Sequence, residues 1–320
     1  MPTDSRTPLR IAYFGLPLGA LLLTRDGHRL GPCVLSPVEA PGLRRVRRVL
    51  GARVLEANQL GSELEGAVDA ALEREAPELV VSWFWTRKLP VRWLERGRLG
   101  ALGVHPSLLP RHRGPNPYFW AVDAGDLETG VTVHRLEAEY DTGAILDRAA
   151  IQVGNRNAWQ LARALDRPSL VALRRTVQRF AEGQVPSSEA QVEALATQAP
   201  EPSGALLRAD FHWTTERVLR RIRALSPVPG LALTLAGMPF FVTHAEPAEG
   251  FVATLEPGEA QIVGERLLLR TADGAISVER ATAPIDSELD TLDLTGRELA
   301  LALIERLESR GAKSFKEEPG

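Results

Sequence analysis

The first half of the chain alternates between short apolar runs, rich in β-branched or aromatic residues, and segments of strong helix formers. Leu9–Phe14, Leu79–Trp85 and Thr129–Arg135 have the character of strands, whereas Leu18–Leu23 and Glu63–Glu75 have that of helices. Strands separated by helices usually pair in parallel through crossover connections. The sequence therefore predicts a Rossmann-like α/β domain with a mainly parallel sheet, which binds ligands at the carboxyl ends of its strands.

The second half of the chain has a different pattern. Trp159–Glu182 is expected to form a long helix interrupted near Pro168, and residues 184–204, rich in Pro, Ser and Gly, to form a linker. A helix at 214–225, with Thr214 or Thr215 as N-cap, and a last helix at 296–309 flank the predicted short strands Leu231–Leu235, Phe240–Thr243, Phe251–Leu255, Arg266–Arg270 and Ile276–Glu279. We expect domains at 1–183 and 205–320, the second a small OB-like β-barrel.

Composition excludes several classes of protein. The chain has 320 residues, of which 44% are hydrophobic and 25% charged, as in ordinary folded proteins. Cys33 is the only cysteine, no apolar run reaches the length of a membrane helix, and the first residues lack the order of a secretory signal. A cytoplasmic protein without a membrane segment is expected, and the spacing of its histidines predicts no metal site.

The segment from Leu99 to Pro117 is the most informative part of the sequence. His105 follows the apolar residues Leu102-Gly103-Val104 and precedes Pro106, which places it where a strand ends and the chain turns outward. Taken alone, a histidine at such a position is more often a structural residue than a catalytic one. The residues around it change that interpretation.

This segment resembles the signature of the formyl-tetrahydrofolate-dependent formyltransferases, Asn-x-His-x-Ser-Leu-Leu-Pro followed by Arg-Gly and Pro. Ser107-Leu108-Leu109-Pro110, Arg113-Gly114 and Pro117 keep that spacing, and Asp141-Thr142-Gly143 follows Thr129-Gly130-Val131-Thr132 at the distance typical of the family. The likeness covers most of the chain, and the layout is closest to that of methionyl-tRNA formyltransferases.

The resemblance implies transfer of a formyl group from formyl-tetrahydrofolate to a primary amine. His105 would carry the proton between the amine and the folate nitrogen, and Asp141 would stabilise the charged imidazole. The family's asparagine, a hydrogen-bond donor to the oxyanion, is replaced by Gly103. Gly103 leaves room for a water or another side chain, and Asn116 is our hypothetical substitute donor, with Ser107 a weaker one.

The resemblance also implies which residues bind the folate. Phe84, Trp85, Thr86 and Arg87 match the family loop that lines the pterin pocket, and Leu136 and Glu139 belong to the same predicted site. Clustered aromatic residues also commonly fill a core, and without the signature that interpretation would be preferred.

The identity of the acceptor stays open. Arginines gather at residues 44–48 (Arg44, Arg45, Arg47, Arg48) and 217–223 (Arg217, Arg220, Arg221, Arg223), where they could contact phosphates or form solvated helix faces. Initiator methionyl-tRNA and an amino sugar are both candidate acceptors. The alternative is a noncatalytic folate- or ligand-binding paralogue that lost the oxyanion donor at Gly103 and with it the activity.

Overall fold

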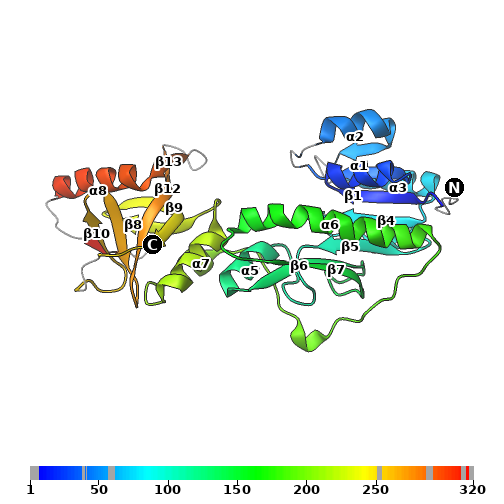
Figure 1. Cartoon of the computed structure of the whole chain (residues 1–320). Helices are drawn as coiled ribbons and strands as arrows, with labels where there is room; N and C mark the ends of the chain where they lie inside the picture. The colour runs from blue at the N-terminus through cyan, green and yellow to red at the C-terminus, as the bar shows by residue number, and fades with distance from the viewer. Residues whose placement is uncertain are drawn as a thin grey trace, which may run out of the picture. The chain divides into compact units, whose positions relative to one another are not determined.

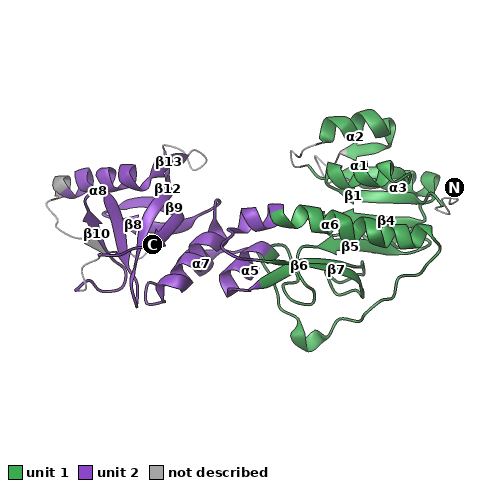
Figure 2. Ribbon diagram, viewed as in Figure 1, with its two compact units in different colours: residues 1–117, 128–152, 164–200 green, residues 118–127, 153–163, 201–320 purple. Residues whose placement is uncertain are grey.

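A computed structural model of the chain describes residues 7–37, 40, 42–56, 62–250, 254–285, 291–310 and 315–316. The chain folds as two compact units, which Figure 2 colours separately. Unit 1 consists of residues 1–117, 128–152 and 164–200, and unit 2 of residues 118–127, 153–163 and 201–320. The chain therefore enters unit 2 and returns twice before residue 200.

Unit 1 is built on a seven-stranded sheet with the strand order β3-β2-β1-β4-β5-β6-β7 (Figure 1). Strands β1 to β5 are parallel, and β6 and β7 are each antiparallel to the strand before them. The mainly parallel Rossmann-like sheet is therefore confirmed. The strands are β1 (Arg10–Gly15), β2 (Arg29–Leu35), β3 (Val54–Glu56), β4 (Leu79–Trp83), β5 (Ala101–His105), β6 (Glu128–Arg135) and β7 (Ile145–Gln152).

The helices in this part of the chain are α1 (Pro17–Arg25), α2 (Leu43–Leu50), α3 (Ser62–Glu75), α4 (Val91–Leu94), α5 (Pro117–Ala124) and α6 (Ala158–Ala181), with a 3₁₀ turn at Gly51–Arg53. The predicted interruption near Pro168 is wrong, because α6 continues through it. Proline removes one backbone donor from a helix. Leu165 and Leu173, which lie before and after Pro168 in α6, are fully buried, and their packing holds the helix together.

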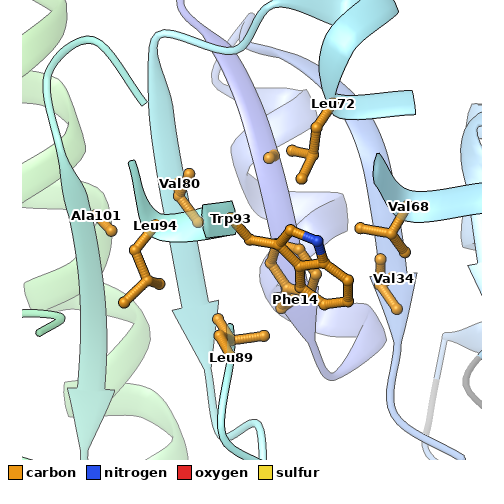
Figure 3. Close-up of a cluster of buried hydrophobic side chains, with 10 residues drawn as sticks. Phe14, Val34, Val68, Leu72, Val80, Leu89, Trp93, Leu94 and Ala101 are labelled. Atoms are coloured by element: carbon orange, nitrogen blue, oxygen red, sulfur yellow. The ribbon is translucent and has the colours of Figure 1, made fainter. Parts of the chain in front are cut away.

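One hydrophobic cluster fixes the first strands of the sheet (Figure 3). Phe14 of β1, Val80 of β4 and Val34 of β2 meet Val68 of α3 there, and Trp93 stacks on Phe14 with ring centroids 5.5 Å apart. Full burial of one such side chain contributes about 1.5–3 kcal/mol. The cluster thereby sets the carboxyl ends of β1 and β4, next to the predicted site.

Unit 2 contains the antiparallel sheet β14-β10-β11-β12-β9-β8, with β13 paired to β12. Its strands are β8 (Leu231–Leu235), β9 (Met238–Pro247), β10 (Glu259–Val263), β11 (Arg266–Arg270), β12 (Ala275–Pro284), β13 (Thr291–Thr295) and β14 (Phe315–Lys316), and its helices are α7 (Thr215–Leu225) and α8 (Gly296–Arg310). The sheet curls into a half-barrel, as predicted. Thr214 is the N-cap of α7, and its hydroxyl accepts from the Arg217 N–H.

One predicted strand of unit 2, Phe251–Leu255, lies mostly outside the described residues. Phe251–Ala253 lie outside the described residues, and Thr254 and Leu255 are not in a strand. The strand begins only at Glu259, after the turn at Pro257-Gly258. The described end of the predicted strand, Thr254 and Leu255, is therefore not paired with a neighbouring strand. Within the described residues, no helix is long and apolar enough to span a membrane.

Candidate active site

His105 is the last residue of β5, at the strand end where the sequence places it. Its imidazole is buried, and its Nε2 lies 2.7 Å from the backbone oxygen of His112. A carbonyl oxygen only accepts hydrogen bonds, so Nε2 carries a proton and donates it. In the neutral ring Nδ1 is therefore unprotonated, and this nitrogen lies 3.5 Å from the Oδ2 atom of Asp141.

Asp141 lies in the loop between β6 and β7. Its φ of 56° is in the left-handed region, which is unfavourable for residues other than glycine. Its Oδ2 atom accepts a hydrogen bond of 3.0 Å from the backbone N–H of Gly114 in the signature loop. At Gly143, two residues later, an added Cβ would come within 2.0 Å of the Arg135 carbonyl oxygen. This close approach explains the glycine of Asp141-Thr142-Gly143.

His134 is a third member of this cluster, and the sequence analysis missed it. It lies on β6 opposite Gly103 of β5, and its Nε2 is 3.6 Å from Oδ1 of Asp141. Its Nδ1 donates to the Arg135 backbone oxygen over 2.8 Å. The signal in the sequence was weak: His134 is two residues after Thr132 and shares its face of the strand. Its proximity to His105 depends on the pairing of β5 with β6.

Burial lowers the pKa of His134 to about 4, against the opposing effect of Asp141 and with a smaller lowering by His105. At neutral pH its Nε2 therefore lacks a proton. The ionised Asp141 then lies between two imidazole nitrogens that each present a lone pair, because both rings donate through their other nitrogen. The two oxygens of Asp141 therefore face the acceptor nitrogens of both rings, with no hydrogen bond between the carboxylate and either imidazole.

The space next to Gly103 is filled. An added Cβ would lie 2.6 Å from Cδ2 of Leu136 and 3.4 Å from Nε2 of His134. Another side chain does reach in, as expected, but it is an apolar leucine that offers no hydrogen-bond donor. Leu136 therefore occupies the volume in which any larger side chain at position 103 would begin.

The two predicted substitute donors are engaged in the signature loop. The Ser107 hydroxyl donates to the Arg111 backbone oxygen over 2.5 Å, and Ser107 is fully buried. Asn116 is half-buried, and its backbone N–H donates to the Ala199 oxygen. These hydrogen bonds hold the signature loop in place. A role of the Asn116 side chain as oxyanion donor stays a prediction.

The three aromatic residues at the end of β4, Trp83, Phe84 and Trp85, do not form one group. Trp83 is buried, donates its Nε1–H to Ser169 of α6, and stacks against Phe84 with centroids 4.9 Å apart. Trp85 instead packs edge-on against Phe14 and is one of the partly buried residues that contact the hydrophobic cluster around Phe14. The core interpretation therefore fits Trp83 fully, whereas Trp85 lies at the edge of the core and is only partly buried.

The indole nitrogen of Trp85 is buried and has no hydrogen-bond partner among the described residues. Leu136 packs against the same hydrophobic cluster as Trp85. A buried donor without an acceptor is costly unless something else satisfies it. The flat, nitrogen-rich ring of a folate supplies such acceptors, so these residues fit the predicted co-substrate.

The remaining predicted folate residues lie on two loops. Thr86 and Glu139 are exposed and Arg87 is half-buried. The loops meet where the Lys88 ammonium lies 5.5 Å from the centre of the Tyr140 ring, a cation–π contact. The two predicted segments are thus brought together, and the assignment of single residues to the folate stays a prediction.

The two arginine clusters differ. Arg44, Arg45, Arg47 and Arg48 are all exposed on α2. In unit 2, however, Arg217 and Arg221 both bind the carboxylate of Asp123, and Arg223 binds Glu216. These three side chains are therefore already paired with carboxylates of unit 2, and a phosphate-binding face at residues 217–223 stays a prediction. Among the residues with described positions, no group of three or more His, Cys, Asp or Glu is arranged to hold a metal ion.

Comparison with known proteins matches two separate parts of the chain to family profiles. A family profile described as "Formyl transferase" matches residues 37–165, and one described as "Formyl transferase, C-terminal domain" matches residues 205–295. Among solved structures, HypX from Aquifex aeolicus in complex with tetrahydrofolic acid superposes with a TM-score of 0.67 at 22% identity, over 94% of this chain and 48% of HypX. The chain thus spans about half the length of HypX.

WlaRD, described as a sugar 3N-formyl transferase, has a TM-score of 0.63 at 13% identity over 84% of this chain and 97% of its own. These two structures support the fold alone. The methionyl-tRNA formyltransferase of Anaeromyxobacter dehalogenans is 33% identical over 88% of this chain and 96% of its own length, and that of Chlorobium phaeovibrioides 32% identical over 85% and 90%. The chain therefore belongs to the formyl transferase family, whose members use formyl-tetrahydrofolate as co-substrate.

Proposed function

We propose that this chain transfers the formyl group of formyl-tetrahydrofolate to a primary amine, with His105 and Asp141 as the proton-transfer pair. The observation that carries the proposal is the cluster at the end of β5. Nδ1 of His105 and Nε2 of His134 lie 3.5 and 3.6 Å from the two oxygens of Asp141. These distances exceed those of ordinary hydrogen bonds, and catalytic contacts often tighten only when substrate binds.

The proposed step balances as follows. The amine nitrogen bonds to the formyl carbon and releases a proton to Nδ1 of His105, while the carboxylate of Asp141 stabilises the imidazolium. The bond between the formyl carbon and the folate nitrogen then breaks, and the same proton passes to that nitrogen. Throughout, Nε2 of His105 keeps its hydrogen bond to the His112 oxygen, which holds the ring in one orientation.

On the folate side, we propose that Trp85 and Leu136 form the wall of the pocket. The unpartnered indole N–H of Trp85 would donate to the ring system, and Leu136 would provide apolar contact. Phe84, Thr86, Arg87 and Glu139 are proposed as the rim on the two loops.

For the acceptor, we propose initiator methionyl-tRNA first. The relatives with about a third of their residues identical carry that name and match nearly over their full length. The four exposed arginines of α2 also suit a phosphate backbone. An amino sugar is the second candidate, because WlaRD is described as a sugar formyl transferase.

One observation favours a second function, a folate- or ligand-binding paralogue without turnover. Leu136 fills the position at which the family has an oxyanion donor. Removing such a donor costs on the order of 10²–10³ in rate in other enzymes. The kept His105–Asp141 pair speaks for catalysis, so turnover decides between the two functions.

The test combines calorimetric binding of a stable formyl-folate analogue with a turnover assay against methionyl-tRNA and a panel of amino sugars. We expect binding and turnover in the unaltered protein, binding without turnover in His105→Asn, and no change in the matched control His244→Asn. His244 is exposed on β9 of unit 2. Binding without turnover of any acceptor would favour the paralogue, and no binding would refute the folate site.

A further inference from the structure

The stretch that the sequence predicts as a linker is partly built into unit 1. Its residues 189–199 lie along the two loops that form the site, as the light-green trace after α6 in Figure 1. Glu189 and Ile145 exchange two backbone hydrogen bonds of 2.8 and 2.9 Å. Further on, the Arg113 N–H donates to the Thr197 oxygen over 2.8 Å, and the Ala199 N–H donates to the Arg113 oxygen over 2.6 Å. We call residues 189–199 the strap.

Gln191 of the strap joins both site loops through its side-chain amide. Its Nε2 donates to the backbone oxygens of Asp141 and Gly143 over 2.7 and 2.8 Å. Its Oε1 accepts from Nε and Nη2 of Arg113 over 3.1 and 2.9 Å. Both donors and both lone pairs of the amide are thus used, which fixes its orientation.

Each of these partners bears on the His105–Asp141 pair. Asp141 has a left-handed backbone, a conformation that persists only where its surroundings hold it. Arg113 is 4% exposed and precedes Gly114, whose N–H binds the Asp141 carboxylate. Gln191 therefore holds the backbone of Asp141 on one side and the loop that supplies its hydrogen-bond donor on the other.

The strap holds the partner of His105 as well. The His112 N–H donates to the Thr197 hydroxyl over 2.8 Å, and the His112 backbone oxygen accepts from Nε2 of His105. His112 also has a positive φ, 59°. The hydrogen-bond partners that orient both members of the pair are thus tied to one eleven-residue segment.

We propose that Gln191 is a positioning residue of the active site, which acts through Asp141 and Arg113 to hold the carboxylate opposite His105. This inference rests on the proposed function. A misplacement of about 1 Å in an active site costs on the order of 10²-fold in rate. We therefore expect Gln191→Met to lower kcat about 10- to 100-fold, with the affinity for a formyl-folate analogue within about twofold of normal.

The matched control is Gln198→Met, a change of the same residue type on the same strap. Gln198 is exposed and has no side-chain hydrogen bond among the described contacts. A double-mutant cycle with Asp141→Asn separates positioning from general destabilisation, because residues that act as one unit are not additive. We expect Gln191→Met to add nothing to the loss caused by Asp141→Asn, whereas additive losses would overturn the proposal.

A second readout does not need turnover. In protein with ¹³C-labelled histidine, the His105 imidazole signal, assigned by its loss in His105→Asn, should shift in Gln191→Met and stay in place in Gln198→Met. An unchanged signal in Gln191→Met would overturn the positioning role. If the unaltered protein shows no turnover but the signal shifts, the proposed activity fails while the positioning of the pair stands.

Discussion

Each unit contains a buried cluster of charged or titratable groups around one aspartate, and the two clusters are bonded in opposite ways. In unit 2, Asp123 receives hydrogen bonds of 2.7 and 2.9 Å from Arg217, and of 2.6 and 3.0 Å from Arg221. In unit 1, Asp141 lies 3.5 and 3.6 Å from its two histidines. The Asp123 carboxylate thus accepts short hydrogen bonds from both of its charged neighbours. The Asp141 carboxylate accepts none from its two histidines.

The electrostatics follow the same contrast. Burial alone would raise the pKa of Asp123, but the hydrogen bonds from Arg221 and Arg217 outweigh it and hold the pKa below its usual range. Trp213 also lies against both guanidinium groups, at 4.3 and 5.2 Å. Both oxygens of Asp123 are thus occupied by guanidinium donors, whereas those of Asp141 are not hydrogen-bonded to either neighbouring histidine.

The sharpest test of this contrast is the exchange of Asp141 for asparagine. The neutral amide keeps the size of the side chain but cannot stabilise a protonated His105. We expect kcat to fall on the order of 10⁴-fold, as for other removals of the carboxylate beside a catalytic imidazole. The thermal midpoint should change by no more than a few degrees. A large loss of stability would show that Asp141 stabilises the fold, as Asp123 does, and would contradict the contrast.

The same exchange at Asp123 should have the reverse outcome. It leaves Arg221, whose side chain is 5% exposed, and the largely covered Arg217 without a counter-charge. Removing one partner of a buried ion pair costs about 3–5 kcal/mol of unfolding free energy.

Urea unfolding measures this loss, with the exposed Asp210→Asn as control, for which we expect at most about 1 kcal/mol. Folate-analogue binding by the folded Asp123→Asn protein should be unchanged. An unfolding free energy equal to that of the control would contradict the contrast.

The two clusters should also respond to acid in separate pH ranges. The pKa of His134 is lowered from 6.5 to about 4, so the unfolded chain binds this proton first and stability falls as the pH drops from 6.5 to 4. At about 1.4 kcal/mol per pH unit, this amounts to roughly 3 kcal/mol. Asp123, whose pKa is lowered, loses its contribution only below about pH 4.

Unfolding free energies measured across this range in the unaltered protein and in His134→Gln provide the check. The loss between pH 6.5 and 4 should shrink in the variant, while the loss at lower pH persists. Parallel curves for the two proteins would show that His134 is not buried in its neutral form.

The smallest expected effect concerns Gly103. Because an added Cβ would approach Leu136 to 2.6 Å, Gly103→Asn alone should destabilise the protein by about 1–3 kcal/mol and give no gain in turnover. Gly103→Asn combined with Leu136→Ala makes room for the carboxamide, and turnover should rise above that of Leu136→Ala alone. A gain in the single variant would mean that Leu136 moves aside freely.

The sequence predicted the features that depend on local pattern. The alternation of strands and helices, the position of His105 at a strand end and the change of fold class after residue 204 all follow from composition and spacing. Pro168 misled because packing holds the helix together on both sides of it, and Thr254 and Leu255 misled because they lie outside any strand.

The features it did not predict depend on distant pairing. His134 and Leu136 reach Gly103 only through the register of β6 against β5. The arginines of α7 have the spacing of a basic face, but Arg221 is buried and donates a hydrogen bond to Asp123, 98 residues earlier in the chain. A side chain such as Gln191, in a segment with the composition of a linker, offers no local signal at all.

The strap has a consequence for how this protein can be divided or recombined. A fragment cut at residue 183, where composition alone suggests a border, would end before Gln191 and Thr197 and would contain Asp123 without Arg217 and Arg221. Such a piece would keep every residue of the family signature and still lack the groups that hold it in place. The segment that must be inherited together is therefore longer than the motif. A chimaera that exchanges the C-terminal domain must keep the chain through residue 200 to retain the strap, and through Arg221 to retain the partners of Asp123.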